Sequence, residues 1–172
     1  FALSSGPPPA GIAVIRISGP QAGPALNALA GKLPTPRRAT LATLADPVDG
    51  SHLDRTMVLW LPGPGTATGE DSAELHLHGG RAVIAAVEAA LERLPGLRRA
   101  QAGEFTRRAF ANGRIDLAEA EGLADLLSAE TELQRRVALA MAEGVLSREV
   151  EAWRNELLRI SARLEAALDF SD

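Results

Sequence analysis

GIAVIRISG, residues 11–19, is a short run of mostly β-branched residues between two glycines. Such a run is typical of a short buried strand, because branched side chains pack well on a pleated sheet. Before it, GPPP at 6–9 predicts a rigid, extended lead-in. After it, apolar residues recur at helical spacing from Ala22 to Leu29 and stop at Gly31, which predicts a helix ending there. The chain therefore opens with a strand followed by a helix.

Outward from this unit, strands and helices continue to alternate. Two apolar-rich segments, 38–45 and 53–61, flank the string DPVDG, which predicts a hairpin with a looped turn. A further strand is expected over 72–78 and a helix over 82–94. We therefore expect residues 1–112 to form an α/β (α+β) domain with a mixed sheet and flanking helices.

Residues 113–172 are predicted to be entirely helical. Proline is absent there, and Asp116 followed three residues later by Glu119 matches a capping box at the start of a helix. A second cap at Thr131 opens a stretch that we expect to run unbroken to Leu168, about 57 Å at roughly 1.5 Å per residue. The second part of the chain is thus expected to be an all-α segment of long helices.

One face of this long helix carries an apolar stripe. Its members follow spacings of four and three: Leu146, Val150, Trp153, Leu157, Ile160, Leu164 and Ala167. This is the pattern of a seam against another helix. A stripe of that length must be buried, so we expect it to be covered by another copy of the chain or by sequence beyond Asp172. The chain is therefore interpreted as truncated.

Charge differs between the two parts. Residues 1–112 carry 11 Lys plus Arg against 9 Asp plus Glu, a net of +2, and residues 113–172 carry 7 against 13, a net of −6. Neither part has the basic excess of a nucleic-acid-binding surface, so direct RNA or DNA binding by this chain alone is not favoured. No apolar run approaches the ~20 residues that a membrane span needs, and the given sequence shows no charged start followed by a short apolar stretch and a cleavage site. A cytoplasmic location without membrane contact is expected.

Three kinds of catalytic motif are absent from the sequence, and this limits the reactions that the chain could catalyse. The chain has no cysteine, which removes disulfides, thiolate metal sites and thiol nucleophiles and fits a reducing compartment. No G-x-x-x-x-G-K-S/T string occurs, and the loop at 63–69 lacks the lysine. Nothing resembles a nucleophile elbow or a Ser, His and acid arrangement. We therefore expect a binding and self-associating module with no catalytic residue in this fragment.

The densest polar cluster is GEDSAELHLHGG, residues 69–80. If 72–78 is extended, Glu74, His76 and His78 point to one face. They are then a metal site, the floor of a binding pocket, or a solvent-facing row on a half-buried strand. Alternate side chains on one strand stand ~7 Å apart and rarely chelate by themselves, so no metal site is expected.

Arginines form a second group of candidates. Arg16 interrupts an apolar strand, so it either lies on the exposed face or is held for an anionic group. The segment 103–126 gathers three further cations and one amide around two phenylalanines: Arg107, Arg108 and Arg114, with Asn112, around Phe105 and Phe110. It is either an amphipathic helix with a solvated basic face or a set of cations at a domain junction, a frequent location for small-molecule pockets.

Three strings occur in the order and spacing of one family: AGIAVIRISG at 10–19, LPGPGTATGEDSAELHLHGG at 61–80, and AGEFTRRAFANGRIDLAEAEGLADLL at 102–127. The chain resembles the amino-terminal part of the MnmE (TrmE) family of tRNA modification GTPases. The resemblance covers nearly the whole chain. It includes EAALDFSD at 165–172, which is similar to the family's helical segment before its GTPase domain.

The resemblance implies a folate-binding-type domain over residues 1–112 that binds a tetrahydrofolate derivative (5-formyl- or 5,10-methylene-tetrahydrofolate) and forms a homodimer. Residues 113–172 would be the first part of a helical domain, truncated before the G domain. GTP, Mg and K are expected only for that missing domain. The complete enzyme would modify the wobble uridine of tRNA (a 5-carboxymethylaminomethyl-type modification) together with the flavoprotein MnmG (GidA).

Motif by motif, the resemblance implies three folate contacts: Arg16 in VIRISG, Glu74 in AELHLHG and Arg114 in NGRIDL. The residue types suit the ligand. A pterin edge offers adjacent N–H donors that a carboxylate accepts together, and arginines suit the glutamate tail or a ring carbonyl.

The chain departs from the family pattern at four positions. Pro8 and Ala10 replace glycines of the leading loop, Leu77 replaces a frequent glycine, and Arg114 stands where lysine is common, which keeps the charge. The loop changes support a second hypothesis, in which the chain is a purely structural dimerisation module whose folate site has decayed.

Overall fold

The computed structural model describes residues 1–169. The last three residues of the string at 165–172 therefore lie outside the described part of the chain. The chain divides into two compact units, Phe1–Arg114 and Ile115–Asp172. Arg114, one of the three residues expected at the folate site, thus belongs to the same unit as the other two.

The first unit is built on a five-stranded sheet in the order β1-β2-β5-β4-β3. The strands are β1 (Ala2–Leu3), β2 (Ile12–Ser18), β3 (Thr40–Ala45), β4 (His52–Leu61) and β5 (Ser72–His78). The strands expected at 11–19, 38–45, 53–61 and 72–78 are confirmed. The two-residue strand β1 was not predicted, because it is too short to show a pattern.

A sheet with flanking helices is followed by a unit of helices, which confirms the expected fold class. The expectation of a mixed sheet, however, is wrong for the described strands. All four pairings are antiparallel. A parallel pair needs a crossover that returns the chain beside the strand it left. Here the helix after β2 leads to β3 at the far edge, and the neighbours of β2 are β1 and β5.

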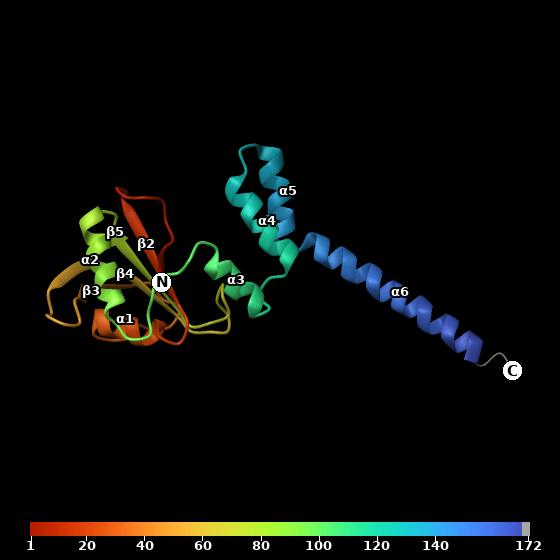
Figure 1. Ribbon diagram of the computed structural model, residues 1–172, viewed down its shortest axis with the longest axis horizontal. Helices are drawn as coiled ribbons and strands as arrows, with labels where there is room; N and C mark the ends of the chain where they lie inside the picture. Colours follow the sequence, from red (N-terminus) through yellow and green to blue (C-terminus); the bar gives the residue numbers. More distant parts are fainter. Residues whose placement is uncertain (170–172) are drawn as a thin grey trace. The chain divides into compact units, whose positions relative to one another are not determined.

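Two helices, α1 (Ala22–Ala30) and α2 (Arg81–Glu92), share a single apolar core with one face of the sheet (Figure 1). Along β2 the residues Ala13, Ile15 and Ile17 are buried in that core, whereas the residues between them are partly exposed. Because side chains alternate across a strand, the residues between them face the opposite side of the sheet, which neither helix covers. We call this side the open face.

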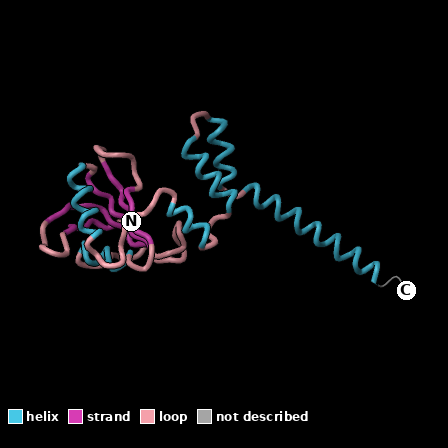
Figure 2. The backbone as a smooth tube through the Cα atoms, in the orientation of Figure 1, coloured by secondary structure: helices cyan, strands magenta, loops and turns pink. Residues whose placement is uncertain are grey.

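The second unit contains only helices and their connections among the described residues (Figure 2). They are α4 (Leu117–Ser128), α5 (Glu132–Ala142) and α6 (Val145–Asp169). Both expected capping boxes, at Asp116 and at Thr131, are present. Within residues 1–169 no helix is both long and apolar enough to cross a bilayer.

The expectation of one unbroken helix from Thr131 to Leu168 is wrong. Gly144 adopts a left-handed conformation, with φ of 72°, and its N–H bonds to the carbonyl of Met141. This is how glycine ends many helices, since it has no Cβ to oppose positive φ. The apolar stripe lies on α6, which has no buried residue among those described. That another helix covers it stays a prediction.

At Gly122 the helices α4 and α5 approach each other closely. A Cβ there would lie 2.5 Å from the backbone nitrogen of Ala142 and 2.6 Å from Cβ of Met141. We expect Gly122→Ala to destabilise the helical unit by about 1–3 kcal/mol, because the helices must separate. Urea unfolding followed by circular dichroism measures this.

Glu121→Ala is the control, because Glu121 is the exposed neighbour on the same helix. Glycine to alanine at an ordinary helix position stabilises by about 1 kcal/mol. A Gly122→Ala protein that is more stable than the wild type would therefore contradict the close approach.

Candidate functional site

Arg16 and Glu74 form an ion pair on the open face. They are direct cross-strand partners on β2 and β5. Nε of Arg16 donates to Oε1 of Glu74 at 3.1 Å, and a terminal guanidinium nitrogen lies 2.9 Å from the same oxygen. The Arg16 side chain is 36% exposed and that of Glu74 is 16% exposed. The pair is therefore partly desolvated but accessible to a ligand.

Two further side chains border this pair. His76, two residues along β5, places Nε2 3.2 Å from Oε2 of Glu74. Phe105 belongs to α3 (Glu104–Ala111), and its ring centroid lies 6.0 Å from Cζ of Arg16. The arrangement joins a carboxylate, a guanidinium, an imidazole and an aromatic ring, drawn from two strands and one helix.

His78 does not join this group, although strand alternation placed it on the face of Glu74 and His76. Its Nδ1 lies 2.8 Å from Oδ1 of Asp54, and its backbone N–H donates to Oδ2 at 2.9 Å. Burial opposes ionisation of Asp54, but the bonds from His78 and from the backbone N–H of Arg55 together outweigh it and hold the pKa of that carboxyl below its usual value. Within residues 1–169, no three His, Cys, Asp or Glu side chains are placed to hold a metal ion.

Arg114 lies just after α3 and is exposed. Its backbone N–H donates to the carbonyl of Ala109 at 2.8 Å, and its Cγ would lie 3.1 Å from a Cβ on Gly69. The side-chain stem therefore packs beside the loop that precedes β5. Among the described residues, no hydrogen bond or ion pair joins Arg114 to Arg16 or Glu74. The structure thus brings two of the three expected residues into contact and leaves the third separate.

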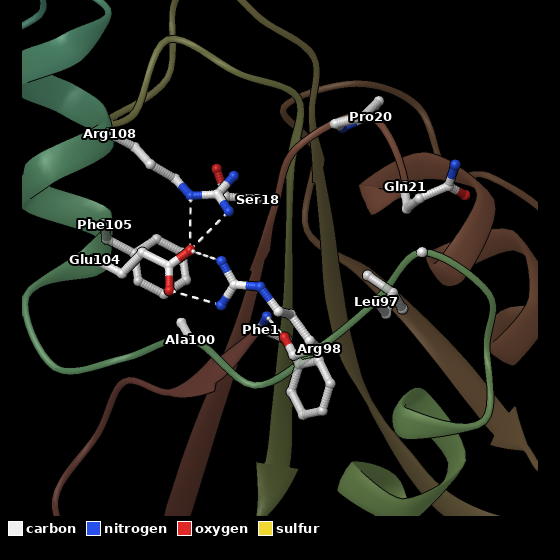
Figure 3. A pocket seen from close by; sticks show the side chains of 11 residues that line it. Phe1, Ser18, Pro20, Gln21, Leu97, Arg98, Ala100, Glu104, Phe105 and Arg108 are labelled. Carbon is white, nitrogen blue, oxygen red and sulfur yellow. Dashed lines mark hydrogen bonds and ion pairs between the residues drawn. The ribbon is translucent and has the colours of Figure 1, made fainter.

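A buried carboxylate that the sequence reasoning missed lies at the start of α3. Glu104 is 3% exposed and accepts hydrogen bonds from both of its arginine neighbours (Figure 3). Arg98 donates at 2.7 and 2.9 Å, Arg108 at 2.7 and 3.1 Å, and the backbone of Gln101 at 2.9 Å. The bonds from Arg98, then from Gln101 and Arg108, hold the pKa of Glu104 far below its usual range.

This network reaches the edge of the Arg16 site. Arg108 also donates to Oε2 of Glu70 at 3.1 Å, and the Ser18 hydroxyl donates to the same oxygen at 2.8 Å. Through Glu70, the network connects α3, the helix that carries Phe105, to Ser18 at the end of β2. A cavity of about 150 Å³ lies beside it, lined in part by Phe105 and Arg108. We call Arg98, Glu104, Arg108, Glu70 and Ser18 the Glu104 cluster.

Only one link of the Glu104 cluster had a local sequence signal. Glu104 and Arg108 are four residues apart, the spacing of neighbours on one helix face. The sequence placed Arg108 either on a solvated basic face or among cations at a domain junction, and neither alternative paired it with Glu104. The contacts to Ser18 and Glu70 depend on how distant segments pack, so neither residue was a candidate.

The fold and the site define the chain as an antiparallel α+β domain with a candidate binding site on its open face, followed by a helical unit. Comparison with known families agrees with this two-part architecture. The family model described as GTP-binding protein TrmE N-terminus matches residues 1–114, and the model described as MnmE helical domain matches residues 117–172. The chain therefore belongs to the TrmE (MnmE) family, as the sequence motifs predicted.

Several curated proteins are similar along the whole chain. The tRNA modification GTPase MnmE of Novosphingobium aromaticivorans is 87% identical over 172 residues, which cover 100% of this chain and 39% of that protein. The proteins of the same name from Rhizorhabdus wittichii and Erythrobacter litoralis are 68% and 67% identical, and the matches cover 100% of this chain and 40% of each. The chain thus spans about two fifths of the length of these relatives.

Proposed function

We propose that the first unit binds a tetrahydrofolate derivative, 5-formyl- or 5,10-methylene-tetrahydrofolate, within a tRNA modification GTPase. The observation that carries this proposal is the Arg16–Glu74 pair on the open face, beside the ring of Phe105. Two of the three expected cofactor contacts thereby lie together with an aromatic side chain at one accessible place.

The donors and acceptors of this pair match the pteridine ring. An ionised carboxylate has about four lone-pair positions and only accepts hydrogen bonds, so Glu74 suits adjacent N–H donors. A guanidinium has five N–H donors and suits a ring carbonyl or a carboxylate. The neighbouring ring of Phe105 supplies apolar surface for a planar ligand.

Arg114 is proposed as the contact at a different part of the ligand. Its side chain is exposed and stands apart from the ion pair, so it does not compete with Arg16 for Glu74. Folate is long, with an anionic glutamate tail remote from its pteridine ring, and a separated cation suits such a molecule.

The names of the relatives extend the proposal to the whole protein. We infer a cytoplasmic enzyme that acts in tRNA modification and whose GTPase activity, with its GTP, Mg and K, belongs to a G domain beyond this chain. Homodimerisation through residues 1–112, the flavoprotein MnmG (GidA) as partner, and wobble uridine of tRNA as substrate are parts of the same proposal. The apolar stripe of α6 is proposed to pack against further helices of the protein.

Isothermal titration calorimetry with 5-formyltetrahydrofolate tests the site. We expect the purified protein to bind one ligand per chain and Arg114→Ala to weaken binding about tenfold, since a charge-assisted hydrogen bond contributes about 1.5–3 kcal/mol. Arg107→Ala is the matched control, because Arg107 is an exposed arginine of α3. Absence of binding, or equal losses in both variants, would count against the proposal.

A second function is favoured by one feature of the site. Oxygens of Glu74 already accept bonds from Arg16 and His76, so the carboxylate has partners without a ligand. A purely structural dimerisation module with a decayed folate site fits this. Light scattering that shows a dimer, together with calorimetry that shows no folate binding, would favour this second function.

A further inference from the structure

The side chain of Arg114 is directed by the packing of its stem. Its guanidinium is exposed and makes no hydrogen bond or ion pair within residues 1–169. Its backbone is fixed, because its N–H donates to the carbonyl of Ala109 at 2.8 Å. A Cβ placed on Gly69 would lie 3.1 Å from Cγ and 3.2 Å from Cδ of Arg114. The direction of the guanidinium therefore depends on where the loop around Gly69 lies.

Asn112 ties this loop to the end of α3. Its Nδ2 donates to the carbonyl of Thr68 at 2.7 Å. A carbonyl only accepts, so the amide nitrogen and not the amide oxygen must face it. The Cβ of Asn112 lies 3.3 Å from the same added Cβ on Gly69. Gly69 is thus enclosed between the Asn112 side chain and the stem of Arg114.

The same loop, residues 66–70, is also anchored to the strand that carries Arg16. Thr68 is 2% exposed, and its hydroxyl oxygen lies 2.6 Å from that of Ser18. Ser18 follows Arg16 by two residues on β2 and so lies on the same face of the sheet. The 66–70 loop therefore links the strand of the Arg16–Glu74 pair to the segment that carries Arg114.

Resting on the folate-binding function proposed above, we propose that Asn112 is a positioning residue of that site. Its bond to Thr68 holds the 66–70 loop against the stem of Arg114 and thereby directs the guanidinium toward the ligand. An arginine loses rotamer freedom when it binds, and a side chain that is ordered beforehand loses less. Without the bond from Asn112, the ligand has to order Arg114 itself.

Asn112→Ala is expected to weaken binding of 5-formyltetrahydrofolate about fivefold in calorimetry, because ordering one flexible side chain costs about that factor in affinity. Asn27→Ala is the matched control. It makes the same chemical change at an exposed position of α1, in the same unit, and is expected to leave the affinity unchanged.

A double-mutant cycle with Arg114→Ala separates positioning from a general loosening of the unit. Arg114→Ala removes the side chain that Asn112 directs, so adding Asn112→Ala to it is expected to weaken binding no further. A loosening that does not act through Arg114 would weaken binding equally in both backgrounds. Additive losses in the double variant would therefore overturn the proposal.

Gly69→Ala perturbs the same contact from the loop side. The added Cβ displaces the stem of Arg114, so we expect about the tenfold loss that Arg114→Ala causes. Gly50→Ala is the control for backbone strain. Gly50 has φ of 74° and Gly69 has φ of 78°, but a Cβ on Gly50 meets nothing within 4 Å. Unchanged binding by Gly69→Ala would contradict the proposed role of the loop.

The remaining outcomes are also decisive. If the wild type binds 5-formyltetrahydrofolate and Asn112→Ala binds it equally well, the role of Asn112 is overturned and folate binding stands. If Arg114→Ala binds as the wild type does, Arg114 is no ligand contact and the role of Asn112 falls with it. If the wild type binds no folate, both the proposed function and the role of Asn112 fall.

Discussion

Glu74→Gln is expected to weaken binding of 5-formyltetrahydrofolate about 100-fold. The substitution keeps the size of the side chain but removes its charge and turns one acceptor oxygen into a donating NH₂ group, which then faces the N–H donors of the ligand. Each charge-assisted hydrogen bond contributes about 1.5–3 kcal/mol, so losing two of them raises the dissociation constant by at least ~100-fold. Calorimetry on the wild type and the variant measures the ratio.

The matched control is Glu88→Gln. Glu88 is 14% exposed, close to the 16% of Glu74, and pairs with Arg99 at 3.0 Å, but it lies on α2 and outside the proposed site. We expect this variant to bind folate as the wild type does. Normal binding by Glu74→Gln, or an equal loss in Glu88→Gln, would show that the carboxylate of Glu74 does not receive the ligand.

Glu104→Gln is expected to destabilise the Phe1–Arg114 unit by about 3 kcal/mol at neutral pH. The substitution removes the buried charge that faces Arg98 and Arg108, and loss of one partner from a buried ion pair costs roughly 3–5 kcal/mol. The lower end applies because both arginines are partly exposed and regain solvent. Urea unfolding measures the change.

Glu132→Gln controls for loss of an ordinary surface ion pair. Glu132 pairs with Arg135 on the exposed side of α5, and its removal is expected to change stability by less than ~1 kcal/mol. Equal effects of the two substitutions would contradict the special position of Glu104.

Acidification is expected to act through the same carboxyl. The pKa of Glu104 is lower in the folded protein than in the unfolded chain, where a glutamate titrates near ~4.3. A depressed folded pKa contributes stability above the unfolded value, and this contribution is lost as the pH falls through the folded value. Glu104→Gln should therefore flatten the dependence of the unfolding free energy on pH below about 5. An unchanged slope would contradict this.

Local patterns determined much of the first unit and of the helices. Alternation over 72–78 put Glu74 and His76 on one face of β5, and the boxes at Asp116 and Thr131 marked where α4 and α5 begin. Such signals involve residues a few positions apart, so the sequence alone contains them. Gly144 carried such a signal too, but the helical spacing on both sides of it hid the break.

What only the tertiary structure decided involves segments far apart in the chain. The register of β2 against β5 places Arg16 opposite Glu74, and the neighbouring strand β4 brings Asp54 into contact with His78. The same holds for Glu104, whose partner Arg108 also bonds to Glu70. Family resemblance, and not a local pattern, singled out the two members of the Arg16–Glu74 pair. Their direct contact depended on strand register, which is set by packing of the whole sheet and not by nearby residues.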